Sequence, residues 1–466
     1  MSKAKEGQAR PPARDLNSVL LAGAKIQKST KEMVAETAAR KKTNTWSTKA
    51  SQNNFGGNPP KYKIIKSTNL NVDGFYYANK NRCKTYFLTH FHSDHYGGIN
   101  QNWDAGIIYC SPVTSKLVVQ ELKVDPKYVY AIPLNTPFTV VSPDCLGKDV
   151  TVSLCEANHC PGAVLFFFSI RNPAKPQSPP TTVLHVGDFR WDRSFMQGID
   201  LVSKICARKV RLNELYLDTT YCDPKYNFPA QRDSIDAALM CAEAEGIEKN
   251  DKTLFVFGAY TIGKEKIFVA VAKAFGKKIW VDARREKILK TFFSEEDAKM
   301  LTRDRGETNV WVVSLGKIVN KGLKEILDDA NRRSGGGLRG TKYQRIVGFR
   351  PSGWTYSGKS TKKKGAIQTT LAPTKKSKVP DIVATRKSGV VSIYGVPYSE
   401  HSSFSELVDC LMCLQPQNIV PTVSADKSRE QVTLLLDSCR ALIKEEKDSG
   451  MHDEEDAKRR NTRGAS

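Results

Sequence analysis

Hydrophobic residues between about residue 62 and residue 221 are grouped into short runs, and turn residues separate each run from the next. Short runs rich in β-branched and aromatic residues are typical of β-strands. The runs lie at residues 84–89, 107–109, 150–154, 164–170, 182–186 and 214–217. We therefore expect one or two β-sheets in this part of the chain.

The pattern changes after Pro224, where apolar runs alternate with longer segments that have the spacing of an amphipathic helix. This alternation predicts an α/β domain. We expect strands at residues 253–258 and 278–281 and helices at residues 264–275 and 286–293.

A third pattern begins at Gly389, where strands are predicted at residues 390–394 and 419–423 on either side of a helix that follows His401. We therefore expect the chain to return to its first domain here.

Three segments contain few large apolar residues, so hydrophobic burial cannot offset the entropy lost on ordering them. Residues 1–60 predict a disordered basic arm, and residues 446–466 predict a charged, disordered tail. Residues 359–387 carry nine Lys or Arg against a single acidic residue, which predicts a basic surface insertion. This insertion could hold nucleic acid or simply be solvated.

The whole chain of 466 residues has a formal net charge of +23. Such an excess favours a polyanionic partner, and nucleic acid is favoured because phosphate neutralisation releases counterions. An anionic membrane surface is the competing interpretation. No apolar run approaches the length of a membrane span, and the N-terminus lacks the apolar core of a secretory signal, so we expect no membrane association.

The eleven cysteines are scattered, and their odd number argues against a complete disulfide framework. We expect a reducing compartment and no disulfide-linked partner. Cys410 and Cys413 have a spacing that also occurs in zinc sites, but they lie within the apolar pattern of a helix. We therefore interpret them as core residues.

Three of the seven histidines fall within six positions at the end of the predicted strand 84–89. These are His90, His92 and His95, and Asp94 lies between them. Neutral imidazoles and carboxylates are zinc ligands, and a loop this dense in ligands is too crowded for one ion. The spacing therefore predicts a metal centre with two ions.

Further ligands are expected on loops that follow strands. His159 lies in the loop 156–162, and His401 precedes Ser403 and Glu406, which match the capping box of a helix. Asp73, Asp188 and Asp218 are carboxylates at predicted strand ends. His185 instead lies inside an apolar run and is expected to be a buried, hydrogen-bonded side chain.

Residues 258–264 contain Gly-x₄-Gly-Lys between a predicted strand and a predicted helix. The pattern resembles a P-loop, but Glu265 stands where a P-loop needs Ser or Thr for magnesium, which argues against an ATPase. The helix amides near Gly263, together with Lys264, could still form a phosphate pocket. Tyr260 could stack on a base or pack in the core.

The order of the ligand candidates resembles the four motifs of the metallo-β-lactamase fold. These motifs are Asp73, His90-x-His92-x-Asp94-His95, His159 and Asp188. Asp218, residues 401–403 and residues 421–423 resemble three further motifs of the β-CASP branch, which processes nucleic acids, and Val423 resembles its DNA-directed members.

Residues 157–163, 217–222, 262–266 and 349–354 are similar to the DNA cross-link repair nucleases, the group that includes Artemis and Apollo. The resemblance covers about residues 62 to 440. It implies an α/β fold in which an αββα metallo-β-lactamase sandwich carries an inserted α/β β-CASP domain. We expect the sandwich at residues 61–223 and 389–445 and the β-CASP domain at residues 224–388.

The resemblance also implies roles for the individual residues. Asp188 would bridge two zinc ions, one of which could exchange with Mg²⁺ or Mn²⁺. Asp73 and Asp218 would not bind the ions themselves but would orient the residues that do. His90, His92 and His159 would join Asp188 at the first ion, and Asp94, His95 and His401 would join it at the second.

The implied activity is phosphodiester hydrolysis in DNA, most simply as a 5′-to-3′ exonuclease in interstrand cross-link repair or end processing. Tyr260, Gly263, Lys264 and Arg350 would bind single-stranded DNA or an end with a 5′-phosphate. A hairpin-opening endonuclease and a non-catalytic DNA-repair scaffold remain alternatives. A nuclear location, suggested by residues 40–42, and DNA-repair proteins as partners complete the expectation.

Overall fold

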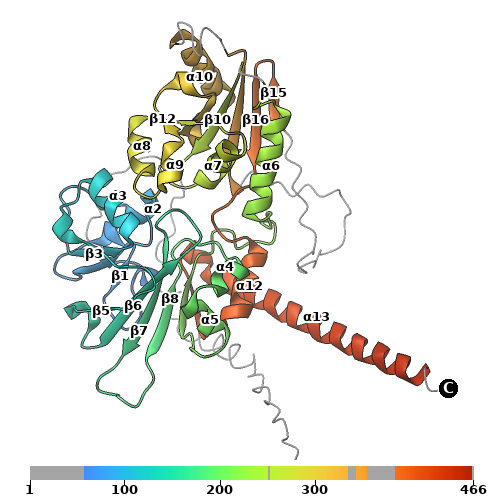
Figure 1. Cartoon of the computed structure of the whole chain (residues 1–466). Helices are drawn as coiled ribbons and strands as arrows, with labels where there is room; N and C mark the ends of the chain where they lie inside the picture. Colours follow the sequence, from blue (N-terminus) through green and yellow to red (C-terminus); the bar gives the residue numbers. More distant parts are fainter. Residues whose placement is uncertain (1–56, 250–251, 334–342, 354–383, 464–466) are drawn as a thin grey trace, which may run out of the picture.

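The computed structural model describes residues 57–249, 252–333, 343–353 and 384–463, which form three β-sheets and their helices (Figure 1). The predicted arm, apart from residues 57–60, lies outside the described residues. So does the predicted basic insertion, apart from residues 384–387.

The first sheet has four parallel strands in the order β1-β2-β3-β4. Its strands are β1 (Asn71–Val72), β2 (Thr85–Phe87), β3 (Ile107–Cys110) and β4 (Val129–Ala131). Helix α3 (Pro112–Leu122) joins β3 to β4 and begins at Ser111, whose side chain accepts a hydrogen bond from the Thr114 amide. Pro112 suits the first helical turn because that turn has no intrahelical use for its N–H.

The second sheet has six strands in the order β17-β9-β8-β7-β6-β5. Its strands are β5 (Phe138–Val140), β6 (Asp149–Glu156), β7 (Val164–Arg171), β8 (Thr181–His185), β9 (Glu214–Leu217) and β17 (Asn418–Pro421). Strand β17 pairs with β9 although about two hundred residues separate them in the sequence. The end of the chain therefore returns to the sheet built by its beginning.

The two sheets pack face to face. The ring centroid of Phe87 on β2 lies 5.3 Å from that of Phe166 and 5.1 Å from that of Phe168, both on β7. Leu165 and Phe167, which alternate with those residues on β7, belong to another cluster that includes helix α12 (Phe404–Leu414). With α3 on the first sheet, these layers confirm the predicted αββα sandwich.

The third sheet has seven strands in the order β12-β11-β13-β10-β14-β16-β15. Its strands are β10 (Thr253–Ala259), β11 (Ile279–Trp280), β12 (Leu301–Thr302), β13 (Val310–Ser314), β14 (Arg345–Pro351), β15 (Ala384–Ser388) and β16 (Val391–Val396). All pairs are parallel except β15 with β16.

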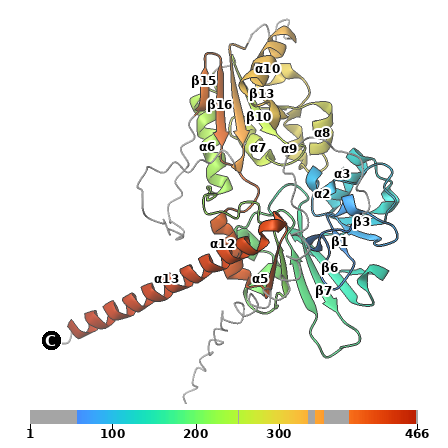
Figure 2. The ribbon, with the colours of Figure 1, turned by 180° about the vertical axis from the view of Figure 1, so that it is seen from behind.

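Helices cover both faces of the third sheet, so its central strands are apolar on both sides. Phe255 and Phe257 of β10 share a cluster with α6 (Gln231–Ala244) and α7 (Glu265–Ala274). Leu254 and Val256, on the opposite face, share a cluster with α10 (Asn320–Arg333). Figure 2 shows this covered sheet at one end of the molecule and the sandwich at the other.

The remaining helices are short, apart from α13. They are α2 (Ser93–Tyr96), α4 (Arg193–Gln197), α5 (Asp200–Cys206), α8 (Ala283–Leu289), α9 (Glu295–Lys299) and α13 (Ser428–Arg463). The 3₁₀ turns are η1 (Lys61–Lys63), η2 (Phe75–Tyr77), η3 (Pro126–Tyr128), η4 (Pro143–Cys145), η5 (Arg305–Glu307), η6 (Leu315–Lys317) and η8 (Ala425–Lys427).

Two expectations differ from the structure. The strand expected at 390–394 in the returning part is β16, which pairs with β14 in the third sheet. We therefore propose that the return to the sandwich begins after Val396 rather than at Gly389. The tail expected to be disordered from residue 446 continues α13 as helix to Arg463, because its Glu, Lys, Ala and Arg residues favour helix propagation.

Candidate metal centre

The first ligand loop begins where β2 ends. Asp73 follows the parallel neighbour β1, so its side chain reaches this loop, and it accepts hydrogen bonds from the amide and hydroxyl of Thr89 at 2.9 and 2.7 Å. It also accepts one from His95 Nδ1 at 2.7 Å. Burial opposes ionisation of Asp73, but the charge and hydrogen bond of His95 bring the Asp73 pKa below its usual value.

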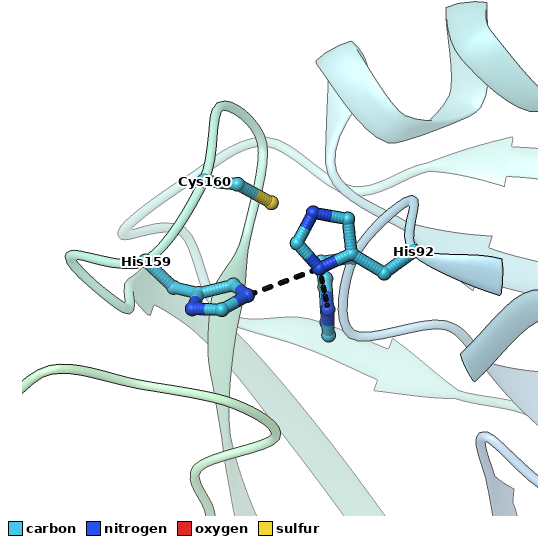
Figure 3. A group of neighbouring side chains, drawn as sticks. His92, His159 and Cys160 are labelled. Atoms are coloured by element: carbon cyan, nitrogen blue, oxygen red, sulfur yellow. Dashed lines mark hydrogen bonds between the residues drawn. The ribbon is translucent and has the colours of Figure 1, made fainter. Parts of the chain in front are cut away.

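Three imidazoles converge on one point beside this loop. His90 Nε2 lies 2.9 Å from His92 Nδ1, and His159 Nε2 lies 3.2 Å from the same atom (Figure 3). His90 and His92 project from the loop after β2, and His159 from the loop between β6 and β7. The structure therefore brings together ligand candidates from different strands of both sandwich sheets.

The far nitrogen of each of these rings is held by a hydrogen bond. His90 donates from Nδ1 to Thr89 Oγ1 at 3.0 Å. The other two donate to backbone carbonyl oxygens, His92 to Ile262 at 3.2 Å and His159 to Glu400 at 2.8 Å. Such bonds fix the ring orientation and leave the converging nitrogens as lone-pair donors.

Asp188 lies among the imidazoles at the end of β8. Its Oδ2 atom lies 3.2 Å from His95 Nε2, 3.7 Å from His90 Nε2, and 3.9 Å from the Nε2 atoms of both His159 and His401. Four rings thus approach one carboxylate oxygen. The Asp188 pKa lies well below its usual value because the nearby histidines outweigh the effect of burial.

His401 is supported by Asp218, which follows β9. Its Nδ1 donates to Asp218 Oδ2 at 2.8 Å, and Asp218 is almost fully buried. Burial lowers the pKa of His401, but Asp218 and Asp188 together raise it to about 9. Asp218 thus accepts a hydrogen bond from Nδ1 of His401, as Asp73 does from Nδ1 of His95.

The histidines differ in protonation. Burial, reinforced by neighbouring imidazoles, lowers the pKa of His159 to about 3 and that of His90 well below its usual value. Both rings are therefore neutral at pH 7, the form that binds metal. His95, between Asp188 and Asp73, has a pKa raised well above its usual value despite its burial.

These residues fit a metal ion of the zinc type. Two nitrogens at 2.0–2.1 Å from a tetrahedral zinc lie roughly 3.3 Å apart, close to the spacing among His90, His92 and His159. Among the described residues, three groups of potential ligands have atoms within 4.8 Å of one another. They are His90, His92, His159 and Cys160; His90, His95 and Asp188; and His159, Asp188 and His401.

Asp94 and Cys160 differ from the expected pattern. The Asp94 side chain is 76% exposed, its Oδ2 lies 3.7 Å from His95 Nε2, and it joins none of the three groups. Cys160 was missed, because no ligand spacing marks a cysteine next to His159, although it lies with His92 and His159 (Figure 3). Burial raises the pKa of Cys160 well above its usual value, so it remains a thiol.

The predicted phosphate pocket at the start of α7 is occupied by carboxylates of the protein itself. The Gly263 amide donates to Glu265 Oε1 at 2.7 Å, and the Lys264 amide donates to Glu400 Oε1 at 2.9 Å. The Lys264 ammonium pairs with Glu400 Oε2 at 2.7 Å. Gly263 has φ +96°, and an added Cβ there would lie 2.9 Å from Glu400 Oε2, so the turn requires glycine.

The other two members of that predicted set are exposed. Tyr260 is 53% exposed, and its ring centroid lies 6.5 Å from that of His92, which excludes the core alternative for Tyr260. Arg350 is exposed near the end of β14, which pairs with β10 just before the Tyr260 loop.

A cavity of about 320 Å³ opens beside the metal-ligand candidates. Three segments of the chain line it: His92 and Asp94 at the start of α2, Tyr260 and Lys264 between β10 and α7, and His401 before α12. The arrangement can hold a metal ion next to space for a substrate.

His185, Cys410 and Cys413 lie outside the candidate site. His185 is buried, accepts a hydrogen bond from the Gly187 amide at 3.1 Å and stacks on Tyr216, but within the described residues its Nε2 has no partner. Cys410 and Cys413 are buried on α12, consistent with their interpretation as core residues. Among the helices described, none is long and apolar enough to span a bilayer.

Residues 295–427 match the family model described as DNA repair metallo-beta-lactamase. The chain is 37% identical over 385 residues to the DNA cross-link repair 1A protein of Homo sapiens. This alignment covers 82% of the chain and 32% of the human protein. It is 35% identical over 394 residues to the DNA cross-link repair protein SNM1 of Arabidopsis thaliana, covering 84% and 72% respectively. It is 29% identical over 364 residues to the 5′ exonuclease Apollo of Danio rerio, and this alignment covers 78% of the chain and 52% of that protein. The chain thus spans about a third of the human relative and most of the plant one.

Proposed function

This chain belongs to the metallo-β-lactamase/β-CASP family of DNA cross-link repair proteins, and we propose that it is a metal-dependent nuclease that hydrolyses phosphodiester bonds in DNA. The observation that carries the proposal is the approach of four imidazoles to one oxygen of Asp188 beside an open cavity. The net charge of +23 supports a polyanionic substrate.

The proposed cofactor is a pair of zinc ions. His90, His92, His159 and Asp188 are proposed to hold the first, and Asp94, His95, Asp188 and His401 the second. The second set contains two carboxylates, and oxygen ligands suit harder ions. We therefore propose that the second site is the one that exchanges with Mg²⁺ or Mn²⁺.

When bound, two such ions supply a nucleophile near neutral pH and neutralise charge on the scissile phosphate. The residues of the chain orient the ligands. Asp73 holds His95 through Nδ1, Asp218 holds His401 through Nδ1, and the Glu400 carbonyl holds His159 through Nδ1. Tyr260, exposed at the cavity, is proposed to stack on a base of the substrate.

The direction of cleavage proposed is 5′ to 3′, with a terminal 5′-phosphate bound near the cavity. Lys264 is engaged by Glu400, so we propose that it neutralises this carboxylate in the cavity wall instead of binding the phosphate. Arg350, exposed near the end of β14, is then the proposed cation for the 5′-phosphate. Phosphate groups favour the planar, bidentate donors of arginine.

The test uses single strands labelled at the 3′ end that carry either a 5′-phosphate or a 5′-hydroxyl, each with and without a chelator. A chelator-sensitive ladder that shortens from the phosphorylated end is expected, and His92→Ala should abolish it while circular dichroism stays unchanged. Equal internal cutting of both strands would instead establish an endonuclease. No cutting by the metal-loaded protein would leave a DNA-binding scaffold.

Arg350→Gln separates the phosphate contact from the chemistry. It should reduce cleavage of the phosphorylated strand toward the rate seen with the 5′-hydroxyl, without changing the latter. Arg303→Gln, at another exposed arginine of the third-sheet region, is the matched control and should change neither rate. Equal losses on both strands with Arg350→Gln would contradict the assigned contact.

The names of the relatives refer to DNA cross-link repair, and we propose the same process for this chain. Its proposed location is the nucleus, and other DNA-repair proteins are its proposed partners. Cleavage should weaken steeply as salt rises, because each phosphate contact releases counterions.

A further inference from the structure

Cys413, one half of the Cys410-x-x-Cys413 motif, has a different partner from the one its spacing suggests. Cys206 is the last residue of α5 and Cys413 the last but one of α12, and these helices pack side by side (Figures 1 and 2). The two side chains interact, and this interaction is the largest influence on the pKa of each thiol. The two sulfurs are therefore neighbours although 207 positions separate them in the chain.

Backbone contacts hold the two helix ends together. The Arg208 guanidinium donates from Nη1 to the Cys413 carbonyl at 2.7 Å and to the Ile205 carbonyl at 3.1 Å. One cation thus bridges carbonyls in the last turns of both helices, where their dipoles favour positive charge. The fold consequently holds the backbones of these two helix ends close to each other.

Polar groups surround the Cys413 sulfur. Gln197 at the end of α4 donates to it from Nε2 at 3.5 Å, and Arg193 on the same helix acts on it electrostatically while pairing with Asp409. The interaction with Cys206 and these groups outweigh burial and Asp409, and lower the pKa of Cys413 to about 6. The ten other cysteines all have raised pKa values.

Access differs between the three cysteines of this region. Cys206 is half-buried, Cys413 is 7% exposed, and Cys410 is fully buried one helical turn earlier. Burial raises the pKa of Cys410 well above its usual value, so it remains an unreactive thiol. A small oxidant can reach the Cys206 and Cys413 pair from the Cys206 side, but not Cys410.

We propose that Cys206 and Cys413 form a peroxide-sensitive dithiol whose oxidation joins α5 to α12 through a disulfide. The Cys413 thiolate attacks one peroxide oxygen, the O–O bond breaks, and hydroxide leaves with a sulfenic acid on Cys413. Cys206 then loses its proton, its sulfur bonds to the Cys413 sulfur, and the sulfenic oxygen leaves as water. Both thiols are oxidised, and the peroxide is reduced to two waters.

The first test treats the 466-residue chain with a slight excess of hydrogen peroxide, blocks the remaining thiols and maps tryptic peptides without reduction. Trypsin isolates Cys206 in the peptide 205–208 and places Cys410 and Cys413 together in the peptide 388–427. The expected product is these two peptides joined, lighter by two hydrogen atoms and separated by a reductant. Oxidation of other cysteines with no joined product would overturn the proposal.

Variants identify which cysteine of the larger peptide reacts. Cys410→Ser should retain the cross-link, and Cys413→Ser and Cys206→Ser should abolish it. Cys222→Ser, at a half-buried cysteine elsewhere, is the matched control and should leave it unchanged. A cross-link that persists in Cys413→Ser and disappears in Cys410→Ser would overturn the assignment, and the wild-type map stands even if one variant fails to fold.

The disulfide should also raise the midpoint of thermal unfolding, because it closes a long loop that contains the third sheet. The midpoint of the oxidised wild-type protein should lie several degrees above that of the reduced form. For Cys206→Ser, the oxidised and reduced forms should have the same midpoint. A lower midpoint for the cross-linked wild type would show that the disulfide strains the fold, and would overturn the inference that the native fold holds these sulfurs in position for the bond.

Discussion

Replacing Glu400 with glutamine is expected to leave the Lys264 ammonium without its anionic partner inside the cavity wall. Both residues are buried, at 3% and 7% exposure, and their charged atoms lie 2.7 Å apart. Removing one partner of a buried ion pair costs about 3–5 kcal/mol. Glutamine keeps an oxygen that can accept from the Lys264 amide, so the change removes charge and preserves shape.

The pKa of Glu400 gives a similar magnitude. Burial raises the pKa of Glu400, but Lys264 and His159 overcome it and lower the pKa from 4.5 to about 2, which corresponds to roughly 3 kcal/mol of stability. Because the pKa is depressed in the folded state, this contribution is present above about pH 4.5. It is lost as the pH falls toward 2.

The assay is urea unfolding at pH 7 of the wild type, Glu400→Gln, Lys264→Met and the double variant. The midpoints of both single variants should fall at an unchanged m-value. The double variant should be more stable than the sum of the single losses predicts, because neither charge is then left alone. A loss below about 1 kcal/mol for Glu400→Gln, or strict additivity in the double variant, would show that the two buried charges do not stabilise each other.

Three further predictions concern the same region. Asp218→Asn should weaken zinc affinity 10–100-fold, because His401 loses the carboxylate that orients it. Competition with a chelating dye measures this affinity. An unchanged affinity would contradict the role of Asp218. Ser403→Ala should cost about 1 kcal/mol in urea unfolding because it removes the capping box of α12, and Ser405→Ala serves as its control. Zinc loading at pH 7 should release protons, measured by calorimetry in buffers of different ionisation enthalpy, because the pKa of His401 is raised to about 9 and the ligand form is neutral. Affinity should accordingly rise with pH up to about 9, and a flat profile would contradict the protonation assigned to His401.

The layers of the fold could be predicted because their signals are local. Alternation on β7 puts Phe166 and Phe168 on one face and Leu165 and Phe167 on the other, and a sequence displays that period directly. The boundary near Gly389 could not be located in the same way. Whether β16 pairs with β14 or with a sandwich strand depends on a partner distant in the sequence.

The candidate site was also predictable only where its signals are local in the sequence. His90, His92 and His95 were visible as a cluster, and the strand ends marked Asp73 and Asp188 as carboxylates of the same region. The structure brings these residues together.

Contacts between distant segments could not be predicted. Glu400 pairs with Lys264, and Cys206 contacts Cys413, only because segments far apart in the sequence fold against each other. Cys160 likewise joins the imidazoles through the course of its loop, which no spacing rule describes.

The convergence of distant segments on Asp188 has a consequence for biosynthesis. His401 follows His90 by 311 positions, and the whole third sheet is made between Asp188 and His401. Because a nascent chain folds from its N-terminus, His90, His92, His95, His159 and Asp188 are present long before His401 leaves the ribosome. A chain truncated within the third sheet would carry the ligands proposed for the first ion, but it would lack a ligand proposed for the second. Premature termination would therefore yield a fragment that carries the ligands proposed for the first ion but not the complete proposed centre.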